Sequence, residues 1–300
     1  MYVIKQVPED FVVEEVSEVE FVPGNFFCYW LKKRDFNTLS ALQLAARANS
    51  LPLSLFSWAG NKDKKAVTKQ LISVKGHSLH KVEFEGVEFV FAGTLDRPVS
   101  LGLLDGNGFR IVVRNLEELP VIKENFVNFF GEQRFSDNNA RIGRALVKKN
   151  FREAVRLLNL PCKDNNFVSA LRSFPKKVLL FYVHAFQSLI WNNAVRLFLV
   201  EHPDVSFDVE LPVVGFGSVV DKFSKKVLEA EGVSPRDFIV KQIPDISSEG
   251  SSRRVWAKAE DLVVPELEDD ELNPGMKKVL LEFFLSKGSY ATEFIRQNFS

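Results

Sequence analysis

The 300-residue sequence lacks the features that mark several protein classes. It has only two cysteines, Cys28 and Cys162, in no metal-ligand spacing, which predicts a reduced chain without a disulfide framework or a zinc site. Its longest apolar stretches are interrupted by polar residues, and its N-terminus has no signal-peptide pattern. We therefore expect a cytoplasmic protein with no membrane span. The sequence contains no P-loop, no G-x-G-x-x-G and no G-x-S-x-G motif.

Neither sign of charge is in excess, because 39 Lys and Arg residues balance 39 Asp and Glu residues. Binding to a polyanion would therefore have to come from local clusters. Residues 62–81 carry six lysines against Asp63, and residues 141–156 are basic again. Residues 260–271 are acidic and end in ELEDDEL, which we interpret as a solvated, charge-repelling loop.

The pattern of apolar residues changes along the chain. DFVVEEV, FFCYWLKK, LISVKG, VEFVFAGTL and FRIVVRNL predict strands, and Asn37 or Thr38 is expected to cap a helix over LSALQLAARA. After about residue 120 the pattern is helical. We expect a helix over 140–158 capped within Ser136–Asn139, a long buried helix over 184–201, and short strands over 205–265. The sequence therefore predicts an α+β protein.

The helix expected over 140–158 would carry a stripe of basic side chains. A solvated face is the simpler interpretation, but only Glu153 interrupts the positive charge, and like charges on one stripe repel each other. A phosphate backbone would relieve that repulsion, so the pattern favours phosphate binding. The stripe comprises Arg141, Arg144, Lys148, Arg152 and Arg156.

The stretch AGNKDKKAVTKQ places Asp63 among lysines. The simpler interpretation is a lysine-rich turn; the alternative is a carboxylate kept ionised by Lys62 and its neighbours, able to act as a nucleophile or base. DGNGF and PEDFVVEE are read as turns that expose Phe109 and Phe11, on which bases could stack. Tyr290 in GSYAT could be a further platform, although each ring alone is more often part of a core.

Taken together, these blocks resemble the TruD family of tRNA pseudouridine synthases. The five blocks occur in the family's order over nearly the whole chain. They are P-x-D-F-x-V-x-E at residues 8–15, G-x-K-D-K/R-x-A-x-T-x-Q at 60–70, G-N-x-F at 106–109, N-Y/F-F-G-x-Q-R-F at 128–135 and G-S-F/Y-A-T at 288–292.

The resemblance implies a pseudouridine synthase catalytic domain with a mixed β-sheet, formed by residues 1–135 and 263–300. An inserted α/β domain peculiar to the family would occupy residues 136–262. This arrangement would explain how the turns at the two ends of the chain could meet.

The resemblance also implies the activity: isomerisation of uridine to pseudouridine in tRNA, at position 13, by a cytoplasmic monomer with no cofactor or metal. Asp63 would be the catalytic carboxylate, acting either at C1′ or on the C2′ proton. The residues implied at the flipped base are Phe11, Glu15, Lys62, Asn107, Phe109 and Tyr290. Those implied at the RNA backbone are Lys64, Lys65, Arg134, Arg141, Arg144, Lys148 and Arg152.

Two other classes of function remain open from the sequence. A non-catalytic RNA-binding protein or tRNA folding chaperone would need the basic and aromatic residues but not Asp63. A metal-dependent nuclease would need clustered acids beside the basic surface.

Overall fold

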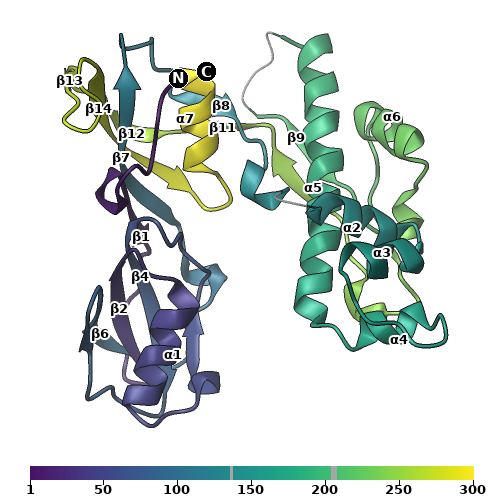
Figure 1. Cartoon of the computed structure of the whole chain (residues 1–300), viewed down its shortest axis with the longest axis horizontal. Helices are drawn as coiled ribbons and strands as arrows, with labels where there is room; N and C mark the ends of the chain where they lie inside the picture. Colours follow the sequence, from purple (N-terminus) through teal and green to yellow (C-terminus); the bar gives the residue numbers. More distant parts are fainter. Residues whose placement is uncertain (136–137, 204–207) are drawn as a thin grey trace. The chain divides into compact units, whose positions relative to one another are not determined.

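The computed structural model describes residues 1–135, 138–203 and 208–300 and divides the chain into two compact units (Figure 1). Unit 1 comprises Met1–Asn125 and Lys258–Ser300, and unit 2 comprises Phe126–Ala257. Unit 2 is therefore one uninterrupted segment, whereas unit 1 is assembled from both ends of the chain. Unit 2 begins at Phe126, ten residues before residue 136, where we expected the insertion to start.

Unit 1 is built on one ten-stranded sheet with the strand order β12-β14-β7-β1-β4-β2-β6-β5, to which β13 and β3 add at β14 and β4. β1 and β4 run parallel and the other neighbours run antiparallel, so the sheet is mixed, as the sequence predicted. The strands are β1 Phe11–Val16, β2 Phe26–Arg34, β3 Phe56–Trp58, β4 Val67–Lys75, β5 Glu83–Phe84, β6 Val87–Leu95, β7 Gly106–Leu116, β12 Glu260–Val263, β13 Glu268–Asp269 and β14 Lys277–Ser286.

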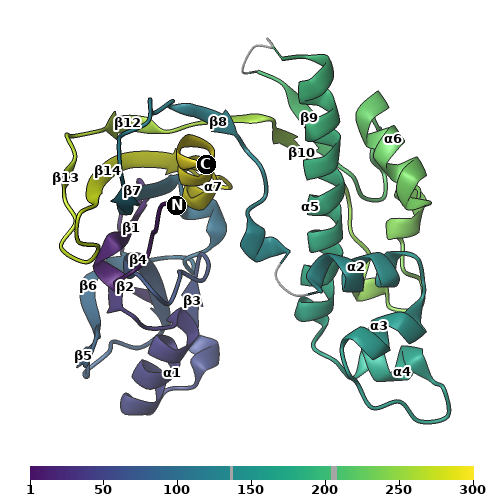
Figure 2. The same cartoon turned by 45° about the horizontal axis from the view of Figure 1, so that its top comes forward.

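Two helices accompany this sheet, α1 (Thr38–Ala48) and α7 (Ala291–Phe299). Asn37 caps α1, because its side-chain oxygen accepts hydrogen bonds from the main-chain N–H groups of Leu39 and Ser40. The buried face of α1, including Leu42 and Ala45, packs against apolar residues of β2, β4 and β6. Figure 2 shows this helix beside the strands of unit 1.

The acidic run near the C-terminus is mostly exposed, as expected of a solvated segment, but Asp270 departs from that expectation. Asp270 is only 4% exposed, and its carboxylate lies 2.7 Å from the guanidinium of Arg114 on β7. The same guanidinium lies 2.8 Å from Asp10 and 2.9 Å from Glu271. Asp10 belongs to the short 3-10 turn Pro8–Asp10 that leads into β1, so this buried network ties both ends of unit 1 to β7.

Unit 2 is organised around one long helix, α5 (Lys176–Glu201), whose buried residues include Phe186 and Trp191. The other helices pack with it into one apolar core (Figures 1 and 2). They are α2 Asn139–Val147, α3 Phe151–Leu157, α4 Phe167–Arg172 and α6 Lys222–Glu231. β9 (Glu210–Val213) pairs with β10 (Ser251–Arg254), and β8 (Asn125–Val127) pairs with β11 (Trp256–Lys258).

The single helix predicted over 140–158 is two helices, α2 and α3. Lys149 between them has φ 58°, a left-handed conformation that an α-helix does not accommodate. The side chain of Asn150 then caps α3 by accepting a hydrogen bond from the N–H of Glu153 at 3.2 Å. A continuous basic stripe is therefore absent. Of the residues predicted to cap this helix, Ser136 and Asp137 lie outside the described part of the chain.

Candidate active site

The loop that carries Asp63 connects β3 to β4 and is fixed by buried polar side chains. The main-chain N–H of Lys62 donates to the Thr38 hydroxyl oxygen at 3.0 Å, and that hydroxyl donates to Gln70 Oε1 at 3.0 Å. The Gln70 amide in turn donates to the Gly60 carbonyl at 2.9 Å. Thr38 and Gln70 are fully buried, so these bonds face no competition from water and hold the loop in one conformation.

Two lysines outside this loop hold Asp63. The ammonium of Lys5 pairs directly with the carboxylate, and Lys33 donates to the main-chain carbonyl of Asp63 at 2.6 Å. The Asp63 side chain remains 35% exposed. The site is therefore an accessible carboxylate with a fixed main chain and a cationic partner.

Sequence reasoning missed Lys5 as this partner. It is the only basic residue in the acidic segment 1–20, which was the available signal. It reaches Asp63 because β1 runs parallel to β4, so the segment before β1 and the loop before β4 lie at the same end of the two strands.

Lys62, predicted to be the cationic neighbour of Asp63, makes other contacts. Its ammonium lies 3.0 Å from Glu15 Oε1 and donates to Asn107 Oδ1 at 2.6 Å. The second oxygen of Glu15 accepts a hydrogen bond from the N–H of Leu71 at 2.9 Å, and Glu15 is only 6% exposed. The structure thus brings Lys62, Glu15 and Asn107 together as a buried polar group on β1, β7 and the Asp63 loop.

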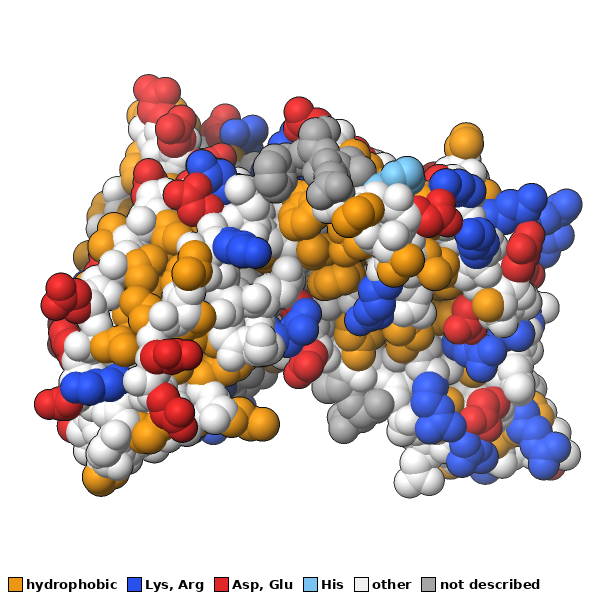
Figure 3. All heavy atoms as spheres, turned by 90° about the horizontal axis from the view of Figure 1, so that it is seen from above, with side chains coloured by type: hydrophobic (Ala, Val, Ile, Leu, Met, Phe, Trp, Pro, Cys, Tyr) orange, Lys and Arg blue, Asp and Glu red, His pale blue; other side chains and the backbone are white. Residues whose placement is uncertain are grey.

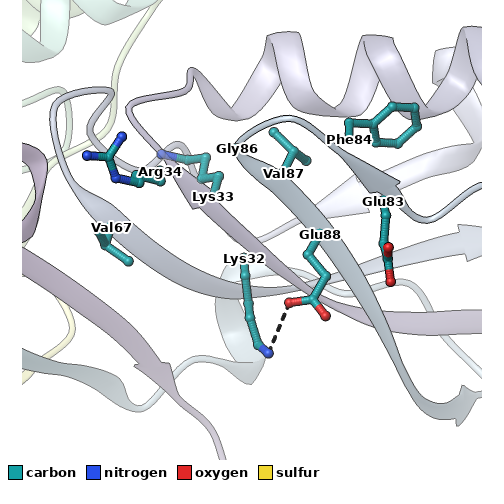
Figure 4. A pocket seen from close by; sticks show the side chains of 9 residues that line it. All are labelled: Lys32, Lys33, Arg34, Val67, Glu83, Phe84, Gly86, Val87 and Glu88. Atoms are coloured by element: carbon teal, nitrogen blue, oxygen red, sulfur yellow. Dashed lines mark ion pairs between the residues drawn. The ribbon is translucent and has the colours of Figure 1, made fainter.

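Lys33 is the most deeply buried lysine of the site, with 2% exposure. Burial lowers its pKa to about 8; the charge of Asp63 opposes that shift and the charge of Lys62 adds to it. Lys33 also lines a hollow of about 390 Å³ beside β2 and β6 (Figure 4). In that view its side chain leaves β2 on the opposite side from Lys32, which pairs with Glu88 at 3.1 Å.

The two phenylalanines expected on exposed turns are buried on strands instead. Phe11 begins β1 and is 3% exposed, and Phe109 lies on β7 and is 8% exposed. Their rings meet edge to face with centroids 6.1 Å apart, and Phe109 stacks on Phe283 at 5.4 Å. DGNGF forms no exposed turn, because β7 starts at Gly106. An added Cβ at Gly106 would lie 2.3 Å from the carbonyl oxygen of Leu285.

The apolar rings and the charged groups are nonetheless adjacent. The Lys5 ammonium, which pairs with Asp63, lies 3.9 Å from the centroid of the Phe11 ring, a cation–π distance. Tyr290, the third predicted ring, is half-buried, and its carbonyl accepts the N–H of Glu293 as α7 begins. The site therefore combines an apolar floor, formed by the rings of Phe11 and Phe109, with the accessible ion pair of Lys5 and Asp63.

The basic residues predicted at RNA phosphates lie in both units. Lys64 and Lys65 are exposed on the Asp63 loop of unit 1. In unit 2, Arg144 pairs with Glu231 at 2.6 Å, and Lys148 donates to the Glu231 carbonyl at 2.9 Å. Glu231 at the end of α6 thus offsets the positive charge of Arg144, a contact that the sequence did not predict.

The remaining predicted RNA-backbone residues belong to unit 2. Arg141 donates to Asn138 at 3.0 Å, and Arg152 is exposed. Arg134 ends the 3-10 turn Glu132–Arg134 and lies over the rings of Phe130 and Phe181. On the face of unit 2 that Figure 3 shows, basic side chains are interspersed with acidic ones.

Two further observations concern the described residues as a whole. Among residues 1–135, 138–203 and 208–300, no three His, Cys, Asp or Glu side chains gather closely enough to hold a metal ion. Within the same ranges, every helix is too short or too polar to cross a membrane.

The mixed sheet with its accompanying helices has the pseudouridine synthase fold. A crystal structure from Methanosarcina mazei that carries the name tRNA pseudouridine synthase D (TruD) superposes with a TM-score of 0.72 at 25% identity. It covers 98% of this chain and 92% of its own.

The sequence comparisons agree with the structural one. The family model for tRNA pseudouridine synthase D (TruD) matches residues 2–162 and 202–298. The tRNA pseudouridine synthase D of Aquifex aeolicus is 28% identical, with 99% of this chain and 97% of the relative covered. A protein of Nanoarchaeum equitans with the name probable tRNA pseudouridine synthase D is 25% identical, with 99% and 98% covered. The chain therefore belongs to the TruD family, a family of isomerases.

Proposed function

We propose that this protein isomerises uridine to pseudouridine in tRNA, at uridine 13, with Asp63 as the catalytic carboxylate. One observation carries the proposal: Asp63 is accessible and paired with Lys5, while its main chain is fixed by Lys33 and its loop by Thr38. A merely solvated lysine-rich turn would not need three buried or half-buried partners from other elements. The family membership supplies the substrate class.

In the proposed reaction the N1–C1′ bond breaks, the uracil turns, and a C5–C1′ bond forms. The C5 proton leaves to solvent, and N1 takes up a proton. The carboxylate of Asp63 stabilises the positive character that develops on the sugar, either by attack at C1′ or by removal of the C2′ proton. A primary isotope effect with deuterium at C2′ would assign the second route, and its absence would assign the first.

The target base must leave its stack to reach Asp63. We assign the apolar floor of Phe11 and Phe109, with the Tyr290 ring, to the flipped uracil, since aromatic rings offset lost base stacking. Glu15 and Asn107 fix the ammonium of Lys62, and we place this group at the polar edge of the base. The residues that we assign to RNA phosphates are Lys64, Lys65, Arg134, Arg141, Arg144, Lys148 and Arg152.

The test is tritium release from a tRNA transcript labelled at uracil C5, with the wild type, Asp63→Asn and Asp261→Asn in parallel. Asp261 is an exposed aspartate of the same unit, so its variant is the matched control. We expect release by the wild type and by Asp261→Asn, no release by Asp63→Asn, and equal tRNA binding by all three. Carbodiimide mapping of the product then identifies the modified position.

Two results would refute the proposal. Full turnover by Asp63→Asn would remove Asp63 from the chemistry. Intact tRNA binding by the wild type without any tritium release would identify a non-catalytic RNA-binding protein. A modified uridine elsewhere than position 13 would correct the site but leave the reaction in place.

A further inference from the structure

A second hollow lies wholly within unit 2, and of the residues assigned above to the base or the RNA backbone, Arg134 alone lines it. It has a volume of about 320 Å³, in the range of sites for small ligands. Three segments line it: the turn that ends at Arg134, the middle of α5 around His184, and β10 at Ser252 and Arg253. We propose that this hollow is a binding site for a phosphate group of an RNA backbone.

The charge of the lining is the first argument. Arg134 and Arg253 lie over the same ring, with guanidinium carbons 5.8 Å and 4.1 Å from the centroid of Phe130. The two positive charges repel each other, and an anion between them would offset that repulsion. Glu249 is the one acidic residue among those that line the hollow, and its side chain is exposed. The described lining therefore carries an excess of positive charge.

The second argument is an unused hydrogen-bond donor. Nε of Arg134 is buried, and it has no acceptor among the residues that the structure describes. A buried donor without an acceptor costs about 1–3 kcal/mol, and most such groups in proteins are satisfied. A phosphate oxygen in the hollow would accept from this nitrogen, and planar guanidinium groups match phosphate geometry especially well.

The frame of the hollow is rigid. Arg253 donates to both oxygens of Asn128, at 2.9 Å to the carbonyl and 2.7 Å to Oδ1. Buried Gln187 donates to the carbonyls of Val214 and Glu249 at 2.9 Å and 3.1 Å. These bonds hold α5, β8 and β10 around the hollow, so its donors are fixed before a ligand arrives, which lowers the entropic cost of binding.

His184 gives the hollow an internal reporter. Its ring is half-buried and lines the hollow. Burial lowers the pKa of His184, and the positive charge of Arg134 lowers it further. An anion bound beside both groups would oppose the second effect and raise the pKa of His184.

RNA is the source of phosphate that we favour, and this choice rests on the proposed function. The experiment is a nuclear magnetic resonance titration of the four histidines in the full chain, free and with three probes. The probes are inorganic phosphate, uridine monophosphate and an unmodified tRNA transcript. We expect tRNA to raise the pKa of His184.

Binding assays with variants complete the test. Arg134→Gln should weaken tRNA binding roughly tenfold, the effect of losing a charged hydrogen bond. The slope of the logarithm of the binding constant against the logarithm of salt concentration should fall by about the value of one phosphate contact. Arg196→Gln is the matched control, because Arg196 also lies over a phenylalanine ring of unit 2, Phe129 at 5.2 Å, but does not line the hollow.

The outcomes separate this inference from the proposed function. A shift of His184 with tRNA, lost in Arg134→Gln, supports the site even if no tritium is released. Tritium release without any shift of His184 overturns the site and leaves the enzyme assignment intact. A shift with uridine monophosphate or phosphate but none with tRNA overturns RNA as the source.

Discussion

Lys33 offers the sharpest test of the site's electrostatics, because its ammonium is buried against the main chain of Asp63. We consider the substitution Lys33→Met, which keeps most of the side-chain volume and removes the charge. The pKa of Lys33 is about 8 in the folded protein against the ordinary value of 10.5. Between these two pH values the unfolded chain binds the proton more tightly than the folded one. Stability therefore rises with pH across this window.

The magnitude follows from the same pKa values. At pH 7 the buried charge of Lys33 costs about 3 kcal/mol of stability, and at pH 10 the cost falls to about 1 kcal/mol. From pH 7 to pH 10, the free energy of unfolding of the wild type should therefore rise by about 2 kcal/mol relative to that of Lys33→Met. The comparison of the two proteins cancels the groups that they share.

The assay must report on unit 1 alone, since a chain with two units need not unfold in one step. Cys28 lies on β2, the strand of Lys33, and is fully buried, so a thiol reagent modifies it only after unit 1 opens. Proteins equilibrated in urea would receive a saturating pulse of reagent, and peptide mass spectrometry would give the fraction modified.

The control is Lys32→Met, on the same strand. Lys32 is about half exposed and paired with Glu88, so its variant should follow the pH dependence of the wild type. A constant difference between the wild type and Lys33→Met from pH 7 to pH 10 would refute the reasoning, because it would mean that burial does not lower the pKa of Lys33.

Three further predictions concern unit 1 and the reaction. Arg114→Met leaves Asp270 buried without its cation and should cost about 3–5 kcal/mol in the Cys28 assay; a loss below 1 kcal/mol would show that the network is dispensable. Lys5→Met removes the cation beside Asp63 and should lower kcat roughly 100-fold in tritium release, with tRNA affinity nearly unchanged; an unchanged kcat would deny Lys5 that role. Gly106→Ala places a methyl group against β14 and should cost about 1–3 kcal/mol by urea unfolding, whereas a neutral effect would show that the strands can separate there.

Local patterns in the sequence were enough to predict much of the fold. The aromatic content of FFCYWLKK predicted β2, and the polar cap at Asn37 predicted the start of α1. The break at Lys149 was missed because a lysine carries no local signal for a left-handed backbone, unlike glycine. The burial of Phe11 and Phe109 was left open, as one of two readings, because a short motif does not show which strands will cover it.

The candidate site was predictable only where its residues share a motif. Asp63 stood out within its own block, whereas its partner Lys5 lies far away in sequence and is brought close by the parallel pairing of β1 and β4. Arg114 and Asp270 were missed for the same reason, since an acidic run gives no indication of a distant arginine. Ion pairs of this kind depend on topology, and topology is a property of the whole chain.

The division of unit 1 between the two ends of the chain has a consequence for synthesis. β7 pairs with β1 on one edge and with β14 on the other, and β14 follows unit 2 in the chain. The ribosome must therefore finish almost the entire chain before β7 finds its second neighbour. Unit 2 is contiguous and can fold first. Until β14 is synthesised, one edge of β7 stays unpaired, and unpaired strand edges promote aggregation. A chain truncated before β14 should therefore combine a folded unit 2 with an aggregation-prone unit 1, and chaperones should be most needed late in translation.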